Sequence, residues 1–142
     1  MEPWPAVRIA VILLAGVAAM LGPLGPQAAP PIGWGALAAI FVFTPLAILL
    51  FLSIQAGTAR SGLLWRRPSW KLNPFNFRDP LQFLQLSVHV CLVHGFLALT
   101  RIAVSPVSFY VEALVPLVVA GGMLVGLQVA MLLFGSKLHH GT

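Results

Sequence analysis

Long apolar runs alternate along this chain with short segments rich in proline or in charge. From Ile9 to Ala59 there is no Lys, Arg, Asp or Glu, and five of the eight Lys and Arg residues then follow between Arg60 and Arg78. A helix of roughly 20 apolar residues can cross the hydrocarbon core of a bilayer. The pattern therefore predicts an all-α polytopic membrane protein, one domain over residues 1–142, with four transmembrane helices at about 7–22, 35–55, 81–104 and 111–135.

Prolines mark the boundaries and one interruption of these spans. The stretch from 22 to 34 holds four prolines and no charge, which is typical of a tight turn. Pro45 falls inside the second span and predicts a kink, where Thr44 could bond part of the backbone that proline leaves unpaired. Asp79 and Pro80 suit the cap and first position of the third helix.

The segment 57–80 joins the second and third spans and interleaves aromatic with basic side chains. Aromatic rings with one polar edge prefer the headgroup layer, and cations there meet lipid phosphate. We expect an irregular interfacial connector that lies flat on the membrane, or else a docking surface for a partner, since Trp and Arg dominate binding hot spots. The residues expected to contact lipid or partner are Trp65, Arg66, Arg67, Trp70, Lys71, Phe75, Phe77 and Arg78.

The distribution of basic residues predicts the orientation. Arg8, the Arg60–Arg78 cluster and Lys137 would lie on one side of a four-span layout, and only Arg101 on the other. Because positive charge is retained in the cytoplasm, both termini are expected there, in a bacterial inner membrane with anionic headgroups. A competing layout has three spans, with residues 1–29 removed as a signal or bound to the surface.

Composition narrows the classes of function. The chain is 59% apolar and 8% charged, whereas soluble domains carry about 25% charged residues. The net charge of +5 fits the orientation rule better than nucleic-acid binding, because the basic residues are separated by apolar runs. Cys91 is the only cysteine, and the three acids, Glu2, Asp79 and Glu112, lie outside the span centres. No catalytic constellation results, so we expect no enzyme.

His89 and His94 fall near the middle of the third span, where an ionisable residue is a candidate functional site. Their spacing of five residues separates them by about 140° around a helix, too far to chelate one metal. Either imidazole could instead be an axial ligand of haem or of a chlorophyll-type pigment. The alternative is that each one bonds a neighbouring helix.

The third span has polar residues on two opposite faces. Gln82, Gln85 and His89 follow one face at spacings of three and four residues, and Ser87, Cys91 and His94 the other. Lipid cannot cover both faces without cost. We therefore expect one face to meet the chain's own helices and the other a second polypeptide.

In the fourth span, Gly122 and Gly126 form a small-residue step that lets helix backbones approach closely. The step could pack against another helix of the chain or against another chain, and Gln128 could supply a polar bond beside it.

These features lead to three hypotheses about function. The first is a non-catalytic membrane subunit, a four-helix bundle that packs against other transmembrane polypeptides or itself, in an accessory or complex-assembly role. The second is a haem- or pigment-binding subunit for electron transfer or light harvesting that uses His89 or His94. The third is a small oligomeric channel or transporter with a path lined by Gln85, His89 and Gln128.

Overall fold

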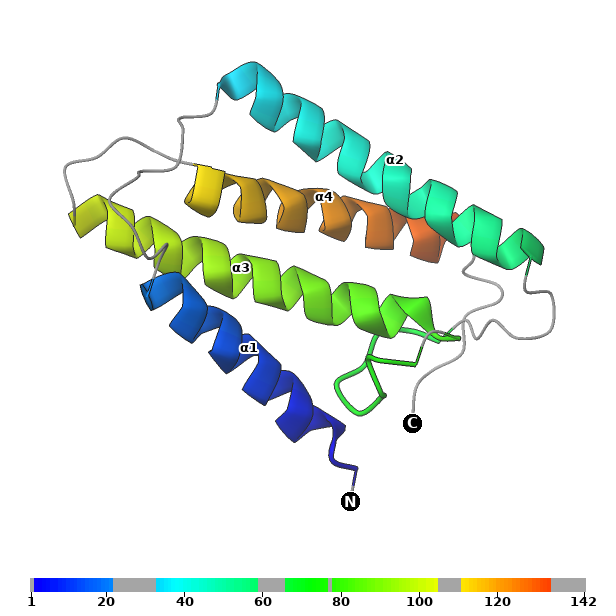
Figure 1. Ribbon diagram of the computed structural model, residues 1–142. Coiled ribbons are helices and arrows are strands. Elements are labelled where there is room, and N and C mark those ends of the chain that lie inside the picture. Colours follow the sequence, from blue (N-terminus) through cyan, green and yellow to red (C-terminus); the bar gives the residue numbers. More distant parts are fainter. Residues whose placement is uncertain (1, 22–32, 59–65, 77, 105–110, 134–142) are drawn as a thin grey trace.

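The computed structural model describes residues 2–21, 33–58, 66–76, 78–104 and 111–133. They form four helices: α1 (Trp4–Leu21), α2 (Trp34–Thr58), α3 (Pro80–Val104) and α4 (Val111–Leu133) (Figure 1). Each is long and apolar enough to cross a membrane. The predicted all-α chain with four such helices is confirmed, and the boundaries differ from the sequence estimates by a few residues.

The helices pack as an open row in the order α1, α3, α4, α2 (Figure 1). The main contacts join α1 to α3, α3 to α4 and α4 to α2. The four helices thus form an open bundle, since α1 and α2, at the two edges of the row, are not among the pairs with the main contacts. Helices α1 and α3 run one way and α2 and α4 the other. The start of α1, the end of α2, the start of α3 and the end of α4 thus share one end of the row.

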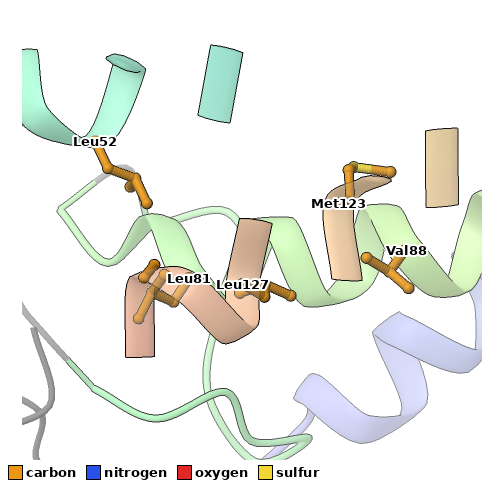
Figure 2. Close-up of a cluster of buried hydrophobic side chains, with 6 residues drawn as sticks. Leu52, Leu81, Val88, Met123 and Leu127 are labelled. Carbon is orange, nitrogen blue, oxygen red and sulfur yellow. The ribbon is translucent and has the colours of Figure 1, made fainter. Parts of the chain in front are cut away.

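The hydrophobic core lies where α4 meets α2 and α3. Figure 2 shows Leu52 from α2, Leu81 and Val88 from α3, and Met123 and Leu127 from α4 gathered in one cluster. Dispersion contacts of this kind hold helices together in lipid, where apolar burial gains little from water exclusion. Many large apolar side chains of α1 and α2 stay on the outside of the row.

The small-residue step of α4 packs against α2 within the chain. A Cβ added to Gly122 would lie 2.7 Å from the Thr44 Cβ and 3.1 Å from the Phe41 carbonyl oxygen, and one on Gly126 would lie 3.3 Å from the Pro45 Cα. Only glycine allows this approach. Of the two packings that the sequence allowed, the structure has the intrachain one.

The helix continues through Pro45. Proline at this position leaves the Phe41 carbonyl without its usual amide donor, and that carbonyl faces Gly122 of α4. Thr44 does not bond it, contrary to expectation: its hydroxyl donates to the Ile40 carbonyl at 2.6 Å. The Phe41 carbonyl therefore points into the α2–α4 interface, where it lies against Gly122. Helix α4 also contains an internal proline, Pro116.

Candidate functional site

The connector, defined here as the described residues between 66 and 79, is built from three short turns. In each turn a polar side chain accepts a hydrogen bond from the amide two residues later. Such turns are typical of Ser and Asn, whose short side chains imitate a backbone carbonyl. The three pairs are Ser69 with Lys71 at 3.3 Å, Asn73 with Phe75 at 2.9 Å, and Asn76 with Arg78 at 3.1 Å.

Gln82, in the first turn of α3, fastens the connector to the helix. Its side chain is fully buried. The Nε2 group donates to the carbonyls of Arg66 (3.4 Å) and Arg67 (3.1 Å), and the Oε1 atom accepts from the Ser69 amide at 2.9 Å. One amide side chain therefore satisfies three backbone groups of an irregular segment, which would otherwise need water.

Arg8 fastens the other side of the connector to α1. It is only 1% exposed, although it lies in the second turn of an apolar helix. Its Nε and Nη2 atoms donate to the Leu72 carbonyl at 3.3 and 2.9 Å, and Nη1 donates to Oε1 of Gln85 at 2.9 Å. The guanidinium also lies 5.8 Å from the ring centre of Trp70, within the range of a cation–π interaction.

The Trp70 side chain reaches from the connector along α3 as far as His89. The Trp70 ring contacts the His89 ring edge-on, with centroids 5.1 Å apart. His89 lies nine residues after Pro80, about 13 Å along the helix. Buried non-helical backbone in the connector needs protein groups to satisfy its polar atoms where water is excluded. Arg8 and Gln82 provide these groups. We use the name Arg8 cluster for the residues Arg8, Trp70, Leu72, Gln82 and Gln85.

Asp79 adds a buried carboxyl beside this cluster. It is 2% exposed and accepts a hydrogen bond from Gln82 Nε2 at 3.4 Å. Burial raises the pKa of Asp79 above its ordinary value, and the Gln82 bond and the charges of Arg66 and Arg8 partly oppose that rise. The carboxyl group thus occupies a site that disfavours its ionised form.

A polar hollow of about 240 Å³ opens between the connector and the start of α1. Two cations, Arg66 and Lys71, and two carboxyl groups, Glu2 and Asp79, contribute to its wall. The remaining lining residues are Trp4, Leu72, Asn73 and Asn76. The wall of this hollow is mostly polar, and it carries both signs of charge.

Both candidate histidines bond backbone carbonyls through Nδ1. His89 pairs with the Gln85 carbonyl of its own helix at 2.8 Å, and His94 with the Ala15 carbonyl of α1 at 3.2 Å. A carbonyl only accepts, so Nδ1 carries the proton in each ring and Nε2 holds the lone pair when the ring is neutral. His94 thus joins α3 to α1 through a hydrogen bond, whereas His89 bonds within α3 and packs on Trp70.

Residues on both polar faces of α3 contact other parts of the same chain. Gln82 and Gln85 face the connector and Arg8, and His94 faces α1. Ser87 bonds the Phe83 carbonyl of its own helix, and Cys91 packs on the hydrophobic core. Gln128 lies exposed on α4, and no hydrogen bond among the described residues joins it to Gln85 or His89.

The expected lipid- or partner-contacting side chains are presented to the outside. Trp65 and Phe77 lie outside the described residues. The others are exposed, including Trp70, whose ring still packs inward on His89: Arg66, Arg67, Trp70, Lys71, Phe75 and Arg78. A connector held from within by buried bonds thus presents its cations and rings outward.

Arg8 is the residue that sequence reasoning missed. The sequence pattern indicates only a cation that contributes to the orientation, whereas the structure buries its side chain. A signal was present, since a charged residue inside an apolar helix is costly and marks a partner. The partner could not be named, because the Leu72 carbonyl lies 64 residues away in sequence.

Among the described residues, no group of three or more His, Cys, Asp or Glu side chains is arranged to hold a metal ion. The fold and the candidate spans define the class of this chain as an all-helical integral membrane protein. Compared with protein-family models, curated proteins and solved structures, the chain has no match.

Proposed function

We propose that the chain is a non-catalytic membrane subunit that packs through the edges of its helix row against other transmembrane helices, from a different polypeptide or a second copy. The observation that carries this proposal is the open row. Helices α1 and α2 each pack mainly on one neighbour. Their outer faces therefore present unpartnered apolar surface.

The outer face of α2 is the stronger candidate for a helix interface, because it exposes aromatic side chains. Phe43 and Phe51 are 66% and 52% exposed. Aromatic side chains supply large contact areas at low entropic cost, which suits a helix interface. Lipid acyl chains would cover the same surface if no partner exists, so the proposal needs a test that separates protein from lipid.

Photocrosslinking in the native membrane provides that test. A benzophenone amino acid replaces Phe43, at the outer face of α2, and in a matched control it replaces Leu52, which is fully buried in the core. We expect a protein adduct of discrete mass from position 43 and none from position 52. If position 43 and the outward Leu13 of α1 both give only lipid adducts, the proposal fails.

The proposed orientation places the connector and both termini in the cytoplasm of a bacterial inner membrane. Support comes from the described basic residues Arg8, Arg66, Arg67, Lys71 and Arg78, which belong to the start of α1 and to the connector, at one end of the row. Arg101, in the last turn of α3, belongs to the opposite end. Retention of positive charge in the cytoplasm favours this direction.

A second candidate is a haem- or pigment-binding subunit. The observation in its favour is the use of Nδ1 by both imidazoles, because a carbonyl on Nδ1 is the usual partner of a histidine that ligates through Nε2. The visible absorption spectrum of protein purified from cells that make these cofactors tests it. A Soret or chlorophyll band that disappears in either His89→Ala or His94→Ala supports it, and a colourless preparation contradicts it.

A further inference from the structure

The polar hollow beside α1 is lined by charged and polar side chains that take no part in the proposed helix interface or in the histidine contacts. It lies at the end of the row where α1 and α3 begin, and the Trp4 side chain forms part of its wall. Aromatic residues of this kind sit at the headgroup layer of a bilayer. The hollow is therefore placed where a lipid headgroup, rather than an acyl chain, would meet the protein.

The wall of the hollow supplies donors for a phosphate. Arg66 and Lys71 provide positive charge. Asn73 and Asn76 also line it, and in both residues Oδ1 is occupied by a backbone amide of the connector. Their Nδ2 groups take no part in these turns and can donate to phosphate oxygens.

The same wall supplies acceptors for a cation. Glu2 and Asp79 contribute carboxyl groups, so the lining residues carry two charges of each sign. Asp79 is almost completely buried, and burial raises its pKa. An ammonium group in contact with this carboxylate would offset the cost of keeping it ionised. A purely anionic ligand would instead be repelled by both carboxylates.

We propose that the hollow binds the headgroup of a phospholipid that carries a primary ammonium group beside its phosphate, as phosphatidylethanolamine does. The phosphate lies between the Arg66, Lys71 and asparagine donors, and the ammonium group lies toward Asp79 and Glu2. The volume of about 240 Å³ is several times the roughly 30 Å³ that one water occupies, which leaves room for both groups. This assignment is independent of the subunit proposal.

The choice among headgroups follows from hydrogen bonding. A primary ammonium donates up to three hydrogen bonds to carboxylate oxygens. A trimethylammonium group, as in phosphatidylcholine, has no N–H to donate, and phosphatidylglycerol has no cation. The expected order of binding is therefore phosphatidylethanolamine first and the other two well below it.

Native mass spectrometry of the full chain, with the three lipids offered at equal concentration, tests the site. We expect phosphatidylethanolamine to bind about tenfold better than phosphatidylglycerol, the effect of roughly one charge-assisted bond. Glu2→Gln removes a lining carboxylate that faces the ammonium group and should lose most of this preference, whereas Arg66→Gln removes a lining cation beside the phosphate and should weaken the binding of both lipids. The matched control for Arg66→Gln is Arg67→Gln, an equal charge change on a neighbouring exposed residue that does not line the hollow, and it should leave the binding of both lipids unchanged.

A second variant guards against loss of structure. Asn73→Asp keeps the oxygen that accepts from the Phe75 amide but replaces the Nδ2 donor with a carboxylate, so it should weaken phosphatidylethanolamine binding without loss of helix content. Suppose instead that phosphatidylglycerol binds more strongly than phosphatidylethanolamine, and that Arg66→Gln and Arg67→Gln lower its binding equally. This result would overturn the proposal in favour of a general attraction to anionic surfaces. Displacement of the lipid by an equal concentration of soluble phosphoethanolamine would overturn the lipid assignment.

Discussion

At the scale of single residues, the connector depends on two side chains that donate hydrogen bonds to the carbonyls of its irregular backbone. Arg8 and Gln82 together bond the carbonyls of Arg66, Arg67 and Leu72. A buried carbonyl without a donor costs about 1–3 kcal/mol. The polar interior of this end of the row is therefore a structural requirement of the connector.

Replacement of Arg8 should release the connector from α1. Arg8→Met removes the donors to Leu72 and Gln85, so we expect a loss of about 2–4 kcal/mol in the free energy of unfolding. Thermal unfolding in detergent measures it, and trypsin should cleave faster after Arg66 and Lys71. Arg67→Gln, at an exposed side chain, is the control and should change stability by less than about 0.5 kcal/mol. Equal stability of both variants would contradict the role of Arg8.

Asp79 should make stability depend on pH. Its pKa is raised in the folded protein, so the folded state binds the proton more tightly than the unfolded state does. The resulting stabilisation is complete below the ordinary pKa and is lost as the pH rises through the raised pKa. Melting temperatures from pH 4 to 8 should therefore show a decline in the wild type that is smaller in Asp79→Asn. An equal decline in both proteins would show that Asp79 does not cause it.

At the scale of the helices, the α2–α4 contact depends on the absence of a side chain. Gly122 and Gly126 lie against Thr44 and Pro45, and proline turns the unpaired Phe41 carbonyl toward the same surface. The predicted interruption at Pro45 and the small-residue step thus belong to one interface. Neither feature alone indicates the other in the sequence.

A graded glycine series tests this interface. The Gly122→Ala methyl would meet the Thr44 side chain and the Phe41 carbonyl, so we expect a net loss of about 1–3 kcal/mol, as in other overpacked cores. Gly126→Ala, at 3.3 Å from Pro45, should cost less. Gly35→Ala enters open space at the start of α2 and should cost nothing. Thermal unfolding in detergent ranks the three, and an equal response at Gly122 and Gly35 would refute the contact.

At the scale of the whole molecule, the row places the connector and the start of α1 at one end, with Gly33 and the start of α2 at the other (Figure 1). The basic charges of the described connector and of Arg8 therefore lie together. That arrangement gives an orientation to test, because the two ends of the row would face different compartments.

Cysteine labelling in a Cys91→Ala background tests the orientation. Lys71→Cys and Gly33→Cys place single thiols at exposed positions of the opposite ends. In intact bacterial cells, an impermeant maleimide should label position 33 and should label position 71 only after the membrane is opened. The reverse pattern would invert the orientation, and labelling of both positions in intact cells would contradict four spans.

The sequence by itself determined the number, type and approximate limits of the helices, because lipid selects long apolar runs and proline ends them. It also marked Gly122, Gly126, Gln82 and Gln85 as packing residues, since small and polar side chains are unusual in such runs. Only the tertiary structure decided what these residues meet. Gln82 bonds the connector, Gly122 meets Thr44, and Arg8 lies beneath Leu72, because contacts between distant segments depend on which helices become neighbours, and no local periodicity records that order.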